Sequence, residues 1–399
     1  MKYLLSTVLV LTGCLSNAHG LWVGPDDKVP TERLLENMKG QLAARPDDAD
    51  LLARIGRVYS LRYSLGERDV HVRVEGDAKK LHLYEHGHGY PSIRHGIDDG
   101  DVAVRIGDLY EALDYYQRAA ALAPDSDYIA LGLGYTYDEL SHAVVVLANP
   151  LGPEFDELRA SLRIAWEDKA LGAYETALGS RPKLEGGFLT PPVSLEAARY
   201  IQEILEQRDR VSRAHKALLK RADAHAREAA RMPRMVTPII FSLTDDRSIH
   251  QLLAPETTVS FDLDGTESGK EWPWVQPDTV LLVWDGDGKG DVPSGRQLIG
   301  SVTWWLFWEH GYAVLTALDD DRDGWLRGGE LTHLAGWRDA NGNGVSDPGE
   351  VLPLEALGVS GLAVSVAGHV DGMPMNPVGV ALSDGRHLPS YDWIVSPVE

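Results

Sequence analysis

Apolar residues recur at helical spacing over residues 30–233, and Pro-Asp turns separate the segments that they define. A repeat near 3.6 residues is typical of amphipathic helices that bury one face. Residues 194–231 contain two further helix candidates, rich in Ala, Glu and Arg. The pattern predicts an all-α domain over residues 21–235.

The pattern changes at MPRMVTPIIFSL, residues 232–243, which has the character of a strand. From there on the chain is rich in Gly, Asp, Val and Trp, and nine of its eleven tryptophans lie after residue 260. The segment VTWWLFW, residues 302–308, either offers stacking faces to a carbohydrate or belongs to the core; tryptophans beside an apolar run favour the core. Residues 236–399 are predicted to form a mixed, β-rich second domain, so the fold class is α+β multidomain.

One motif of the helical region has a family resemblance. The segment ALDYYQRA, residues 112–119, is followed by Pro124 and by LGYTY at residues 133–137. This pattern resembles the tetratricopeptide repeat, in which small residues such as Ala112 and Gly134 let helices approach closely. Similar offsets recur elsewhere: Leu52, Ile55, Gly56 and Tyr59 after Pro46, and Ala170, Tyr174 and Ala177 before Pro182. Because the three prolines are spaced more widely than the family's repeat of about 34 residues, we predict an irregular array that acts as a protein-interaction scaffold.

Residues 69–96 interrupt this array. Valines alternate at positions 70, 72 and 74, which suits a strand or hairpin. The insertion also holds five histidines: His71, His82, His86, His88 and His95. A transition-metal site needs two or three of them to converge, and we favour a polar surface hairpin instead.

The first twenty residues, MKYLLSTVLVLTGCLSNAHG, are typical of a secretory signal peptide, with an apolar run too short to span a bilayer. Within them, Leu11-Thr12-Gly13-Cys14 resembles the lipobox of bacterial lipoproteins, whose cysteine is lipidated; soluble export with cleavage after Gly20 is the alternative. No later segment has the roughly 18 apolar residues of a transmembrane helix. We expect an exported protein of the periplasm or outer envelope, with membrane contact only through a lipid on Cys14.

The net charge of -22 argues against a nucleic-acid or anionic-membrane partner and favours cations. Cys14 is the only cysteine, so the exported chain has no disulfide to stabilise it. A bound metal is one alternative source of stability.

Two segments meet the requirements of an EF-hand calcium loop. Such a loop has side-chain oxygen ligands at positions 1, 3 and 5, glycine at position 6, a carbonyl ligand at position 7 and a bidentate glutamate at position 12. The first loop supplies these in order: Asp319, Asp321, Asp323, Gly324, Trp325 and Glu330. The second loop does the same, with a water-linked ligand at position 9: Asp339, Asn341, Asn343, Gly344, Val345, Asp347 and Glu350. The sequence predicts two Ca²⁺ sites.

Charge and spacing predict how these loops behave. The first loop has four carboxylates among its direct ligands and the second only two, so we expect tighter binding in the first. Only residues 331–338 separate the loops, and their apolar residues predict about two turns of shared helix. Leu326 lies at position 8, where EF-hand loops pair through a short strand contact. With so little helix to swing, we expect calcium to act as a structural clip rather than as a switch.

A third, incomplete loop begins at Asp285 and keeps Asp287 and Gly290, but Lys289 takes position 5 and Arg296 takes position 12. We expect it to be metal-free, since a cation does not ligate a cation. Over about residues 258–365, the ordered motifs FDLDG, WDGDGKG, GRQLIG, LDDDRDGWL and WRDANGNGVSDPGEV resemble a calcium-binding domain of exported bacterial proteins, including some of haemolysin type. The resemblance implies calcium binding and a mixed fold of short helices and strands, but no catalytic activity.

These observations predict a calcium-binding exported protein whose helical array contacts a protein partner. One alternative is a calcium-dependent sensor of that partner. Another is a hydrolase with an unrecognised active site, although the chain has no GxSxG, HExxH or Walker motif and no cysteine nucleophile. We expect the protein not to be an enzyme.

Overall fold

The structure is a computed structural model of the chain, and it describes residues 28–65, 70–71, 99–148, 152–179, 193–208, 211–229, 235–265 and 269–398. The expected signal peptide with Cys14 lies outside the described residues. So do four histidines of the insertion, His82, His86, His88 and His95.

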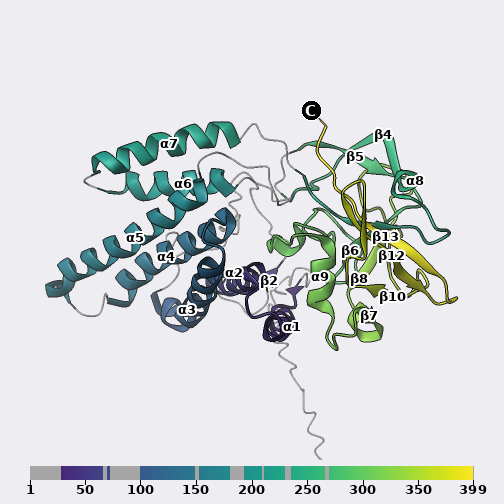
Figure 1. Ribbon diagram of the computed structural model, residues 1–399, viewed down its shortest axis with the longest axis horizontal. Helices are drawn as coiled ribbons and strands as arrows, with labels where there is room; N and C mark the ends of the chain where they lie inside the picture. The colour runs from purple at the N-terminus through teal and green to yellow at the C-terminus, as the bar shows by residue number, and fades with distance from the viewer. Residues whose placement is uncertain are drawn as a thin grey trace, which may run out of the picture.

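The first half of the described chain is helical, as the sequence predicts. Each helix packs against the next along the chain, so the helices form successive layers (Figure 1). The short strands β1 (Lys28–Val29) and β2 (Val70–His71) pair with each other, and β2 contacts the second helix. The helices are α1 (Thr31–Ala44), α2 (Ala49–Leu65), α3 (Asp99–Leu122), α4 (Asp127–Ala148), α5 (Asp156–Leu178, after the 3₁₀ turn η4, Pro153–Phe155), α6 (Val193–Glu206) and α7 (Arg213–Ala229). Among all the described residues, no helix is both long and apolar enough to span a membrane.

Glycines let buried tyrosines fit between these helices. The ring of Tyr116, in α3, contacts Gly56 of α2 and Gly132 of α4, and a Cβ at Gly132 would overlap it. Gly134 faces the buried ring of Tyr174 in the same way, where a Cβ would lie 2.5 Å from a ring carbon. The ring of Tyr174 therefore requires a residue without a side chain at position 134.

The second half is built on a nine-stranded antiparallel sheet that forms a half-barrel (Figure 1). The strand order is β7-β10-β12-β13-β3-β6-β8-β9, and β11 pairs with β12 beside this path. The sheet strands are β3 (Ile239–Phe241), β6 (Val280–Trp284), β7 (Trp325–Arg327), β8 (Leu334–Trp337), β9 (Val351–Pro353), β10 (Val359–Ala363), β11 (Gly368–Val370), β12 (Met373–Leu382) and β13 (His387–Asp392). Around it lie α8 (Ile249–Leu252), the pair β4 (Leu253–Ser260) and β5 (Glu271–Val275), η5 (Thr303–Trp305), α9 (Gly311–Leu318) and η6 (Gly328–Leu331).

Residues 332–338 contain no helix, so the prediction of a two-turn helix shared over residues 331–338 is wrong. The 3₁₀ turn η6 ends at Leu331, and β8 pairs with both β6 and β9 inside the sheet. All four residues of β8, LAGW, are buried. A short apolar run of this kind suits a buried strand as well as a helix, and periodicity alone does not separate the two.

The aromatic segment at residues 302–308 belongs to the core, as predicted. Trp304, Trp305 and Trp308 are only 2–3% exposed. Trp304, Trp305 and Phe307 adopt positive φ angles of 53°, 60° and 54°, which bulky residues rarely do. Helix α2 contacts the segment through the buried Arg57, which donates a hydrogen bond to the carbonyl oxygen of Trp305 (3.3 Å). One hydrophobic cluster thus runs through both halves of the described chain.

Candidate metal centre

The first candidate loop begins where α9 ends, and Asp319 follows its last residue. Oxygen atoms of Asp319, Asp321 and Asp323 lie within 4.8 Å of one another. Gly324 has a φ of 88°, which supplies the sharp turn of position 6. Three carboxylate oxygens this close suit a hard cation.

The same hydrogen bonds recur at the same positions of both loops. The side chain of position 1 accepts from the backbone amides of positions 4 and 6, at 2.8 and 3.1 Å in the first loop and at 2.8 and 2.7 Å in the second. The side chain of position 3 accepts from the amide of position 5, and that of position 5 from the amide of position 7, at 2.7 to 3.0 Å. The glutamate of position 12 accepts from the amides of positions 2 and 9, at 2.7 to 3.1 Å. Two segments of different sequence therefore hold their candidate ligand oxygens in one hydrogen-bond pattern.

The second loop connects β8 to β9 and has its own supporting contacts. Asp339 is fully buried, and its Oδ2 accepts a hydrogen bond from the indole Nε1 of Trp274, on β5 (2.6 Å). Oδ2 of Asp347 accepts from the side-chain amides of Asn341 (2.7 Å) and Asn343 (2.9 Å). These bonds hold both amide nitrogens on Asp347, so the two amide oxygens are the candidate ligand atoms of positions 3 and 5.

Burial disfavours the charged form of Asp319, in the first loop. It raises the pKa of this carboxyl group, and the hydrogen bonds from the amides of Gly324 and Arg322 oppose this effect. The nearby charges of Glu330 and Asp321 raise the same pKa further. A dication among these carboxylates would favour their charged forms and remove the repulsion between them.

The incomplete third loop keeps part of the hydrogen-bond pattern of the two candidate loops. Asp285, at position 1, accepts a hydrogen bond from the amide of position 6 (3.1 Å). The ammonium of Lys289 lies 3.2 Å from Oδ2 of Asp287, so the chain supplies its own cation there. Arg296 is turned away and donates to the carbonyl oxygen of Gly265 (2.7 Å).

The strand contact expected at Leu326 forms with a different partner. Leu326 is fully buried in β7 and pairs with Leu362 of β10. At position 8 of the second loop, Oγ of Ser346 accepts a hydrogen bond from the amide of Val292 (2.8 Å). Val292 is position 8 of the third loop. The second loop therefore contacts the incomplete loop through position 8, while the first loop joins the sheet.

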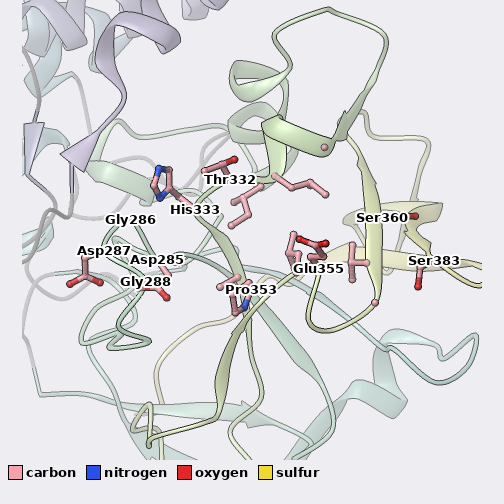
Figure 2. Close-up of a pocket in the computed structure, with 17 residues that line it drawn as sticks. Asp285, Gly286, Asp287, Gly288, Thr332, His333, Pro353, Glu355, Ser360 and Ser383 are labelled. Atoms are coloured by element: carbon pink, nitrogen blue, oxygen red, sulfur yellow. The ribbon is translucent and has the colours of Figure 1, made fainter.

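A cleft of about 740 Å³ lies beside the third loop (Figure 2). The imidazole of His333 packs near Trp284, with ring centroids 5.3 Å apart, and the hydroxyl of Ser360 donates to a backbone carbonyl oxygen. Figure 2 shows His333 on one side of the cleft and Ser360 and Ser383 on the other, so the imidazole and these hydroxyls lie apart. The polar side chains of the lining are Asp285, Asp287, Thr332, His333, Glu355, Ser360 and Ser383.

Comparison with protein families matches residues 239–376 to the family described as the SPM domain. The match runs from the start of β3 into β12 and contains both candidate calcium loops. No tetratricopeptide or EF-hand family is detected. Among curated proteins, a segment is 36% identical over 94 residues to the iron-regulated protein FrpA of Neisseria meningitidis serogroup C, covering 22% of this chain and 8% of that protein. The chain therefore spans less than a tenth of this relative's length.

Proposed function

We propose that the protein binds two Ca²⁺ ions, one in each of the loops at residues 319–330 and 339–350. The observation that carries this proposal is the hydrogen-bond pattern that both loops share, position by position. The first ion is held by Asp319, Asp321, Asp323, the carbonyl of Trp325 and Glu330. The second is held by Asp339, Asn341, Asn343, the carbonyl of Val345, Glu350 and, through water, Asp347.

The chemistry of the ligands supports calcium over other metals. Every side-chain ligand is a carboxylate or amide oxygen, which suits a hard cation better than zinc or copper. The ligand positions are those of a loop that wraps a large ion with one bidentate glutamate, whereas Mg²⁺ demands a tighter octahedral shell. In an exported protein the surrounding calcium is high enough to fill even weak sites.

Calcium in this proposal acts mainly as a structural clip. The first loop runs from the end of α9 through β7 into η6, and the second connects two strands of the same sheet. Neither loop lies between two long helices of the kind that swing apart in calcium sensors. Each ion would instead neutralise clustered carboxylates and fix one end of a strand.

Isothermal titration with calcium tests the proposal on the full chain. Wild type is expected to bind two ions, while Glu330→Gln and Glu350→Gln each lose one, because position 12 supplies two ligand oxygens. Glu355→Gln removes the same charge outside both loops and serves as the control with two ions bound. A wild-type protein that binds no calcium would overturn the proposal.

The helical half is proposed to be a protein-interaction scaffold in an exported or envelope-anchored protein. The tetratricopeptide-like motifs and the signal-like first residues support this. A pull-down from native envelope with and without calcium tests it. Capture under both conditions supports the scaffold, capture only with calcium supports the sensor alternative, and no capture contradicts both.

A further inference from the structure

Helix α1 packs against α9, the helix that leads into the first calcium loop (Figure 1). The last carbonyl groups of a helix have no partner within that helix. In α9 they accept hydrogen bonds from side chains of α1, spaced four residues apart on one face. In order, Gln41 donates to the carbonyl oxygen of Thr316 (2.9 Å), Asn37 to that of Ala317 (3.0 Å) and Arg33 to that of Leu318 (2.6 Å).

The same face of α1 reaches the loop itself. Asp320 is at position 2 of the loop, which does not supply a ligand. Its Oδ1 accepts hydrogen bonds from Arg33 (2.7 Å) and Asn37 (2.8 Å). Gly40 faces the guanidinium of Arg322 at position 4, and a Cβ at Gly40 would overlap that group. Asn37 is 4% exposed, so its amide is buried within this contact.

Asp320 also touches the ligand that closes the loop. Its backbone amide donates to Oε1 of Glu330 (2.7 Å). One residue is therefore bonded through its side chain to α1 and through its backbone to the glutamate of position 12. Fixing Asp320 from α1 restricts the loop before a cation arrives, so binding costs less conformational entropy.

We propose that α1 is a component of the first calcium site, so that docking of α1 and occupancy of this loop stabilise each other. The inference rests on the proposed calcium binding and adds to it a contact from the helical half. Coupling of this kind is reciprocal. Loss of the α1 contact weakens calcium binding in the first loop, and loss of calcium loosens α1.

Calcium titration of the first loop alone tests the coupling, with the second loop disabled by Glu350→Gln. In that background, Asn37→Ala is expected to weaken binding about tenfold, within the usual range for coupled sites. Because Asn37 is neutral, Asn37→Ala does not change the charge near the calcium site. Glu36→Gln, on the exposed side of the same helix, is the control and leaves the affinity nearly unchanged.

Arg33→Gln separates the coupling from simple electrostatics. Removal of a positive charge near a cation site would by itself strengthen calcium binding, whereas the coupling predicts weaker binding. In a Glu330→Gln background, Asn37→Ala is expected to leave the affinity of the second loop unchanged, which shows that the variant is folded.

Amide hydrogen exchange measures the reverse direction. Calcium is expected to slow exchange in α1 more in Glu350→Gln, which keeps only the first loop, than in Glu330→Gln, which keeps only the second. If wild type binds no calcium, the proposed function fails. If it binds calcium but Asn37→Ala and Arg33→Gln keep the wild-type affinity in the first loop, the coupling alone is wrong.

Discussion

At the residue scale, Asp392 is a carboxyl group that the core encloses completely. Its Oδ1 accepts a hydrogen bond from the amide of Gly311, the first residue of α9 (2.8 Å). Burial raises its pKa to about 8, against 3.8 for an ordinary aspartate. Because the folded state holds the proton more tightly, this contribution to stability is complete below the ordinary pKa and is lost as the pH rises through the folded-state pKa.

Asp392→Asn is therefore expected to change how stability depends on pH. The amide stays neutral, so wild type should lose stability relative to the variant as the pH rises from about 4 to about 8. Urea unfolding of both proteins across this range, at one calcium concentration, measures the difference. A difference that stays constant with pH contradicts the assignment.

Two tryptophans of β5 provide a matched pair of variants that test the hydrogen bond to the buried Asp339, a candidate ligand. Both Trp272 and Trp274 are fully buried, but only Trp274 donates to Asp339, and the indole nitrogen of Trp272 has no hydrogen-bond partner among the described residues. Trp274→Phe is expected to destabilise the protein by about 1–3 kcal/mol more than Trp272→Phe, because the buried acceptor Asp339 loses its donor. Urea unfolding at a fixed calcium concentration compares them. Equal losses would show that ring volume alone matters.

At the element scale, two helical glycines have opposite surroundings. A Cβ at Gly132 would overlap the ring of Tyr116, whereas one at Gly107, in α3, meets nothing within 4 Å. Gly132→Ala is expected to destabilise the helical half by about 1–3 kcal/mol through overpacking. Gly107→Ala is expected to stabilise it by up to about 1 kcal/mol through helix propensity. Thermal melts followed by circular dichroism check the two signs, and a stabilised Gly132→Ala would contradict this packing.

The helices of the first half follow from the sequence because their apolar positions repeat over many turns. Strand β8 does not, because four buried residues carry no period and the strand depends on neighbours far along the chain. The candidate ligand positions of both loops are likewise local, because they are predicted from spacing alone. Their supporting contacts are not: Trp274 is 65 residues from Asp339, and Arg33 is 287 residues from Asp320. Such contacts arise only when the whole chain is packed.

At the scale of the whole molecule, the two halves share one hydrophobic cluster. Helix α1 contacts α9, Arg57 of α2 bonds to Trp305, and the rings of Tyr128 and Phe307 meet edge to face with centroids 6.2 Å apart. A core that crosses the boundary favours one cooperative unfolding transition. Calcium bound in the second half should therefore also stabilise the helices of the first.

Two spectroscopic probes can measure whether calcium bound in the second half stabilises the first. Nine of the eleven tryptophans lie after residue 260, so fluorescence reports mainly on the second half, while the helical circular dichroism signal reports mainly on the first. With calcium at about a hundredfold excess over its Kd, each site adds about 2.7 kcal/mol of stability. EDTA is expected to lower both melting midpoints by the same amount, and added calcium in excess should restore both. A shift in the fluorescence midpoint alone would mean that the halves unfold separately and that the shared core does not couple them.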